Sequence, residues 1–158
     1  IDESLDIVAH ACQHEPRLAL TTEQDSHYQA LLTELSNLFI PALNRIKYST
    51  RYENVDRATE LATAQRFCHQ LEQQLKHRAY LYSDTMSKAD IVILPFVRQL
   101  HLADASLYSQ WHHQKLQHWL ERITQSRLFA HIMKKWPVWQ PHHDNALLEA
   151  TLNIDDWQ

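Results

Sequence analysis

The chain has 158 residues, of which 44% are hydrophobic and 22% are charged, and its net charge is −4 with the histidines neutral. This composition indicates about one soluble globular domain with a buried core, and the lack of a Lys/Arg cluster argues against nucleic acid as the main partner. The sequence also contains no glycine, the residue that gives phosphate-binding loops their positive φ angles, so a P-loop or a dinucleotide-binding site is not expected.

Neither a signal peptide nor a membrane-spanning apolar run is visible in the sequence. The two cysteines, Cys12 and Cys68, form no disulfide framework, which fits a reducing compartment. We therefore expect a cytoplasmic protein without a membrane partner. The first residue is Ile1 rather than Met, so we expect that the chain is processed or is a fragment.

Apolar residues recur in steps of three and four along most of the chain, which is the period of amphipathic α-helices. One such stripe contains Leu31, Leu35 and Leu38, and Pro41 is expected to bend the helix that carries it. No stretch alternates with the period of a strand. The sequence therefore predicts an all-α helical bundle, with helices over residues 3–14, 21–46, 55–77, 87–100, 107–124 and 126–133.

The helix predicted over residues 87–100 is expected to be the centre of the bundle. It opens with Ser87 and Asp90 at the spacing of a capping box, in which each side chain satisfies a backbone N–H of the first turn. We expect this pair to be structural and its loss to cost about 0.5–2 kcal/mol. Residues 91–97 are apolar on every face apart from the interruption at Pro95, which is typical of a buried helix.

Twelve histidines raise the question of a metal site. His10 and His14 share a helix face, whereas the adjacent pairs at 112–113 and 142–143 point in different directions. The sequence has neither HExxH nor CxxC. Solvated surface histidines are the better interpretation, so we expect no metal. Cys68 is expected in the core, and neither cysteine has the setting of an activated nucleophile.

Five motifs in and around the predicted helices stand out. They are Lys47-Tyr48 with Arg51-Tyr52, Tyr80-Leu81-Tyr82-Ser83-Asp84, Ser87-Lys88-Ala89-Asp90, the apolar helix with Pro95, and Trp119-Leu120-Glu121-Arg122 with Ser126. The order of these motifs resembles the helical C-terminal domain of the cytosolic glutathione transferases, in their bacterial form. The resemblance covers residues 1–139 and implies that fold. Its best match is the central helix with its preceding loop, although Ser83 stands where the family often has glycine.

The start of the chain is similar to the end of the thioredoxin-like domain of that family. Glu3 and Ser4 resemble the pair that holds the γ-glutamyl end of glutathione, the co-substrate; an ordinary helix cap is the other interpretation. The resemblance implies a remnant last helix of a thioredoxin-like domain at 1–16, the helical domain at 17–140 and a C-terminal tail at 141–158. The thiol-activating residue would lie in the missing domain, so we expect the isolated chain to be catalytically silent.

The resemblance also implies a role and partners. The helical domain would form the electrophile-side wall of the active site, with Asn37, Phe39 and Tyr48 as candidates for it, although core packing is the better interpretation of Phe39. It would dock the missing thioredoxin-like domain, and we expect a homodimer that associates through the apolar face of residues 5–12. The alternative is a non-enzymatic protein-interaction module with the same fold, since fold does not fix function.

Overall fold

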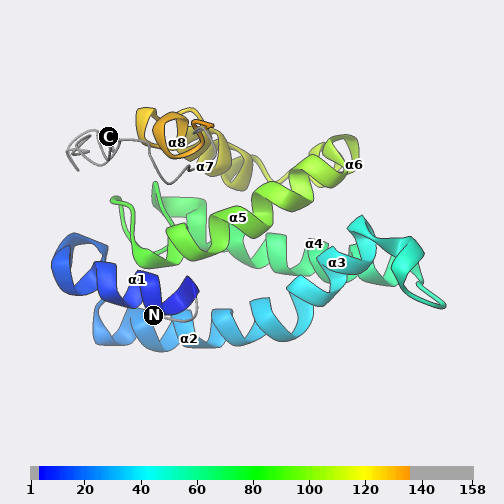
Figure 1. The fold of residues 1–158 in the computed structure, drawn as a ribbon, viewed down its shortest axis with the longest axis horizontal. Helices are drawn as coiled ribbons and strands as arrows, with labels where there is room; N and C mark the ends of the chain where they lie inside the picture. The colour runs from blue at the N-terminus through cyan, green and yellow to red at the C-terminus, as the bar shows by residue number, and fades with distance from the viewer. Residues whose placement is uncertain (1–3, 136–158) are drawn as a thin grey trace, which may run out of the picture. The chain divides into compact units, whose positions relative to one another are not determined.

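The computed structural model describes residues 4–135, and within this range the chain forms helices and turns without a strand (Figure 1). The expected all-α fold is therefore confirmed. The chain forms two compact units, residues 1–120 and 121–158, and α7 begins in the first and ends in the second. The helices are α1 (Ser4–His14), α2 (Thr22–Glu34), α3 (Ile40–Lys47), α4 (Arg57–Gln74), α5 (Lys88–Ala103), α6 (Ala105–Gln110), α7 (Gln114–Thr124) and α8 (Arg127–Ile132).

Short 3-10 helical turns in the described range lie at Pro16–Leu18, Ser49–Arg51 and Leu75–His77. Three expectations fall outside it: the role of Glu3, the C-terminal tail at 141–158 and the histidine pair at 142–143.

The bend expected at Pro41 is preceded by a wider, π-helical turn over Leu35–Phe39 that joins α2 to α3. In this turn the Ile40 N–H donates to the Leu35 carbonyl, five residues back. Pro41 has no N–H, and in a regular α-helix its ring would clash with the carbonyl four residues before it, so a widened turn just ahead of it relieves the conflict. Figure 1 shows α3 turning away from the direction of α2 after this segment.

Helix α5 lies in the middle of the first unit and supplies much of its core (Figure 1). The apolar side chains of Ile93 and Val97 are completely buried, and Leu100 is 2% exposed. The expectation that this helix is buried on every side is wrong, however. Pro95 is exposed and Ile91 and Phe96 are only half-buried, so one face of α5 is left open.

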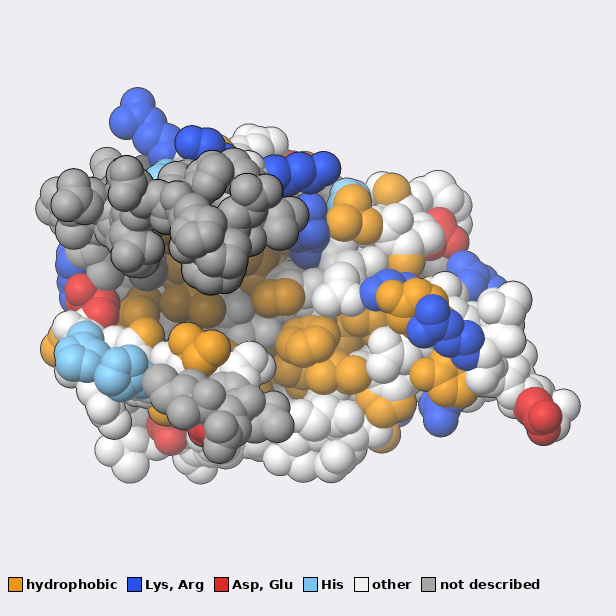
Figure 2. Space-filling view, in the orientation of Figure 1, with side chains coloured by type: hydrophobic (Ala, Val, Ile, Leu, Met, Phe, Trp, Pro, Cys, Tyr) orange, Lys and Arg blue, Asp and Glu red, His pale blue; other side chains and the backbone are white. Residues whose placement is uncertain are grey.

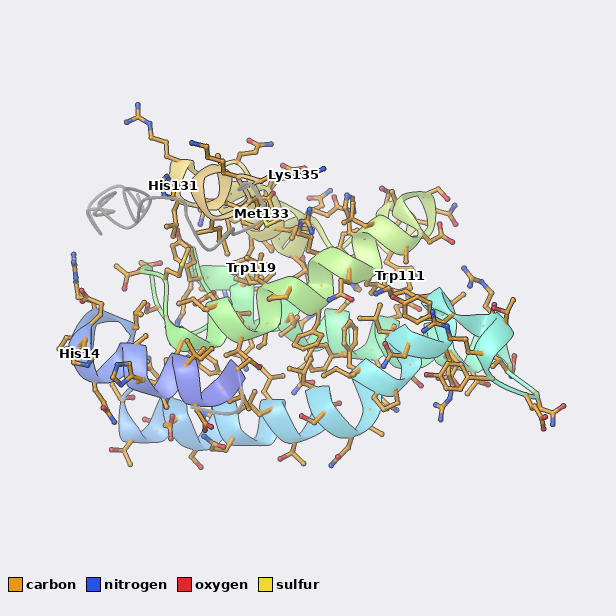
Figure 3. The ribbon with its side chains drawn as sticks, in the orientation of Figure 1. His14, Trp111, Trp119, His131, Met133 and Lys135 are labelled. Atoms are coloured by element: carbon orange, nitrogen blue, oxygen red, sulfur yellow. The ribbon has the colours of Figure 1, made fainter. Side chains whose placement is uncertain are left out.

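Ser87 and Asp90 form the capping box at the start of α5. The Ser87 N–H and hydroxyl both donate to Asp90 Oδ2, at 2.9 and 2.8 Å. Asp90 Oδ1 accepts from the Leu81 N–H at 3.0 Å and from the indole N–H of Trp119 at 2.8 Å. In Figure 3, Trp119 lies beside α5. Asp90 therefore links the preceding loop and α7 to α5, which is more than a helix cap does.

The loop before α5 forms its turn without a left-handed residue at Ser83. The Tyr80 N–H donates to the Ser83 carbonyl at 3.0 Å, and the Ser83 hydroxyl donates to the Thr85 carbonyl at 2.6 Å. In the described range, positive φ occurs at Asn54 and His112 but not at Ser83. The turn thus needs no glycine, because these hydrogen bonds close it within ordinary backbone geometry.

The single helix expected over residues 107–124 is wrong, because the chain breaks there into α6 and α7. His112 adopts φ of 55° at the break, a conformation that a continuous right-handed helix excludes. Glu72 of α4 stabilises the new helix start, since its carboxylate accepts from the Lys115 and Leu116 N–H groups at 3.2 and 2.8 Å. Within the second unit, α8 has the expected cap: Ser126 Oγ accepts from the Phe129 N–H at 3.1 Å.

Candidate functional site

An open groove of about 780 Å³ lies in the first unit, along the exposed face of α5. Figure 2 shows hydrophobic side chains gathered on the surface between α5 and the α2–α3 segment. Its volume is typical of sites for small organic ligands. The groove is lined by Ser4, Leu5, Ile7 and Val8 from α1, by Leu32, Leu35, Ser36 and Ile40 from the α2–α3 segment, and by Ile91, Val92, Pro95, Phe96 and Gln99 from α5.

The α5 wall of the groove follows from helical spacing. Ile91, Pro95 and Gln99 are four residues apart, so they form one stripe along the helix, and Phe96 lies beside it. Pro95 also removes the N–H that would otherwise pair with the Ile91 carbonyl. The same helix thus turns Ile93 and Val97 into the core and this stripe toward the groove.

Helix α1 forms the opposite wall but contributes no buried residue. Leu5 is 46% exposed and Ile7 is 59% exposed, although both line the groove. Ser4, one of the two residues expected to contact glutathione, lies at the start of α1 and also lines the groove. An amphipathic helix of this kind normally covers its apolar stripe with another element.

The three residues expected to form the electrophile wall are not brought together, and none of them lines this groove. Asn37 is exposed in the π-helical turn. Phe39 is completely buried, and its ring centre lies 4.6 Å from that of Phe67 in the core. Tyr48 is 37% exposed at the end of α3. The groove is instead lined by Ile91, Pro95 and Phe96. The sequence feature that could have indicated them is a proline inside an apolar helix.

The described residues hold no activated thiol. Burial raises the pKa of Cys12, although the Lys88 ammonium partly offsets this effect. Burial also raises the pKa of Cys68, which is completely buried. Both side chains are therefore neutral thiols near pH 7. In residues 4–135 no group of three or more His, Cys, Asp and Glu side chains is arranged to hold a metal ion.

The model of the family "Glutathione S-transferase, C-terminal domain" matches residues 19–126. The chain belongs to this family. The match covers α2 to α7, including the Ser87/Asp90 box and the α5 wall of the groove, whereas α1 lies before it. No curated protein and no solved structure matches the chain. Among the helices of the described range, none is both long enough and apolar enough to cross a membrane.

Proposed function

We propose that this glutathione transferase-type helical domain forms the electrophile-binding side of an active site whose glutathione-binding side is a separate thioredoxin-like domain. The observation that carries the proposal is the apolar groove on α5, which is open and has Ser4 at its wall. Ser4 and Glu3 are the residues whose counterparts in the family hold glutathione. A ligand in the groove would thus lie next to the co-substrate, in the cytoplasm.

In this proposal the helical domain binds and orients the electrophile. Contact with Ile91, Pro95 and Phe96 removes the apolar surface of the electrophile from water and holds the electrophile against α5. The thioredoxin-like domain lowers the pKa of the glutathione thiol. The resulting thiolate attacks the electrophilic carbon and displaces its leaving group, or attacks a disulfide and displaces one of its sulfurs as a thiolate. The neutral thiols of Cys12 and Cys68 are unsuited to this role, so the 158-residue chain alone is expected to be inactive.

The exposed apolar residues of α1 support a docking role for this helix. Leu5 and Ile7 are accessible in the isolated chain and would be covered by the sheet of the thioredoxin-like domain. Without that domain, the same face is expected to make two copies of the chain associate. Sedimentation at increasing concentration checks this expectation. A chain that stays monomeric, with amide exchange as slow in residues 5–12 as in residues 91–97, contradicts it.

The test of the proposal uses the native protein, recovered from its source cells through a C-terminal tag. Its intact mass and N-terminal sequence are measured, and conjugation of glutathione to a neutral aryl halide is assayed beside the 158-residue chain. We expect a thioredoxin-like sequence before Ile1, conjugation by the native protein and none by the short chain. A native protein that neither conjugates nor binds glutathione contradicts the proposal and favours an interaction module.

A further inference from the structure

The groove ends beside a lysine whose charge has no carboxylate partner in the described residues. Lys47 is the last residue of α3, and its ammonium donates to Gln99 Oε1 at 2.6 Å. Gln99 is the last groove residue on α5. Within residues 4–135 the ion pairs of the first unit join other residues, and Lys47 is in none of them.

The position of Lys47 follows from helix geometry. Ile40 lines the groove, and Lys47 follows it by seven residues, which is two turns along the same face of α3. Helices α3 and α5 pack against each other, and the Lys47–Gln99 hydrogen bond joins the last residue of α3 to the C-terminal half of α5. The ammonium thus lies at one end of a groove that is otherwise mostly apolar.

The surroundings of Lys47 add positive rather than negative charge. Its ammonium lies 4.8 Å from the ring centre of Tyr48, and the guanidinium of Arg51 lies 4.4 Å from the same centre. Two carboxylates of the first unit are paired with arginines, Glu60 with Arg45 at 3.3 Å and Asp104 with Arg57 at 3.2 Å. Figure 2 shows Lys and Arg side chains among hydrophobic ones around α3.

We propose that the groove binds elongated apolar molecules that carry one carboxylate, with the apolar part along Ile91 and Phe96 and the carboxylate on the Lys47 ammonium. A charge-assisted hydrogen bond to a carboxylate is stronger than the present one to a neutral amide. The role of such molecules as electrophiles rests on the function proposed above. Lys47 then determines specificity and takes no part in the reaction with glutathione.

A purely structural role for Lys47 makes a different prediction. A cation in the last turn of a helix interacts favourably with the helix dipole, and Lys47 occupies that position in α3. Loss of that interaction would lower the stability of the chain but would change the binding of acidic and neutral ligands equally. The preference between the two ligand types therefore separates the two roles.

The test titrates the 158-residue chain with a dansyl-labelled undecanoic acid and with the primary amide of the same compound, followed by dansyl fluorescence. We expect the acid to bind about tenfold more tightly than the amide, and Lys47→Met to abolish this preference while leaving the affinity for the amide unchanged. Lys76→Met is the matched control: Lys76 is exposed in the turn after α4, lies outside the groove lining and is expected to leave the preference intact.

Three results would overturn the inference: equal affinity of the unmodified chain for acid and amide, no binding of either, or a preference that survives Lys47→Met. The titration contains no glutathione, so it does not depend on the transferase activity. If the native protein fails to conjugate glutathione while the Lys47-dependent preference is present, the proposed function is wrong and the ligand class stands. If it conjugates neutral and acidic electrophiles equally, with and without Lys47, only the ligand class is wrong.

Discussion

The two sides of α5 show how one helix supports both the stability and the proposed function of the domain. At its first turn, the buried Asp90 accepts hydrogen bonds from Ser87, Leu81 and Trp119 and thereby ties α5 to its surroundings. Along another face, Ile91 and Pro95 line an open groove. Polar residues of this helix thus stabilise the fold, while part of its apolar surface stays open along the groove.

The largest effect is expected from removing the buried carboxylate. Asp90→Ala leaves the N–H groups of Leu81 and Ser87 and the indole of Trp119 without their acceptor in the core. We expect the free energy of unfolding to fall by roughly 3–5 kcal/mol, measured by urea denaturation. Asp90→Asn keeps the shape of the side chain and one acceptor oxygen, so its free energy of unfolding should fall by less. A loss of no more than about 2 kcal/mol for Asp90→Ala would mean that the pair is only a helix cap.

Burial raises the pKa of Asp90, and its hydrogen bonds to Leu81, Ser87 and Trp119 each lower it, with burial the larger effect. The sequence predicted the capping box because its two members are three residues apart. It did not predict the bonds to Leu81 and Trp119, nine residues before and 29 residues after Asp90, since these depend on how the loop and α7 pack. Local spacing alone therefore undervalues the structural role of this carboxylate.

A matched pair of isoleucines on α5 separates the two faces directly. Ile93 is completely buried, so Ile93→Ala should cost about 2–5 kcal/mol through lost burial and the cavity left behind. Ile91 is half-buried in the groove wall, so Ile91→Ala should cost less than about 1.5 kcal/mol. Urea denaturation of both variants checks the difference. Equal losses would show that the groove is closed in solution.

The open face of α5 could not be predicted from the sequence, because residues 91–97 are apolar throughout and show no polar side. Periodicity located the helices well, from α1 to α8, since core burial selects apolar residues at that spacing. It missed the break at His112, because the left-handed conformation there is adopted by a residue other than glycine. Periodicity also did not decide whether Phe39 belongs to the electrophile wall or to the core. The structure places its ring against Phe67 in the core.

A smaller effect is expected at the start of α7, where a carboxylate again satisfies backbone donors. Glu72→Ala removes the acceptor of the Lys115 and Leu116 N–H groups. We expect a loss of about 1–2 kcal/mol, as for other helix N-terminal caps, measured by urea denaturation. Glu72→Gln retains an acceptor oxygen and should lose about half as much. If both variants are as stable as the parent chain, the contact of Glu72 with the start of α7 contributes nothing to the free energy of unfolding.

The smallest effect concerns acid stability. His113 is 5% exposed, and its burial lowers its pKa, an effect that Glu72 opposes and His69 reinforces. The unfolded chain therefore binds a proton more readily, so stability is present above about pH 6.5 and is lost as the pH falls below it. His113→Gln should reduce the dependence of the unfolding free energy on pH between about pH 5 and pH 7. An unchanged pH dependence of the unfolding free energy would show that protonation of His113 does not cause the loss of stability in acid.

Binding of the electrophile on the open face of α5 can be tested by placing a charge on that face and measuring glutathione conjugation by the native protein. Ile91→Asp puts a carboxylate into the groove wall, and Leu102→Asp puts one on an exposed part of the same helix outside the groove, where Leu102 is 63% exposed. We expect kcat/KM for a neutral aryl halide to fall at least about tenfold in Ile91→Asp and to stay unchanged in Leu102→Asp. Equal activity of the two variants would show that the electrophile does not bind on this face of α5.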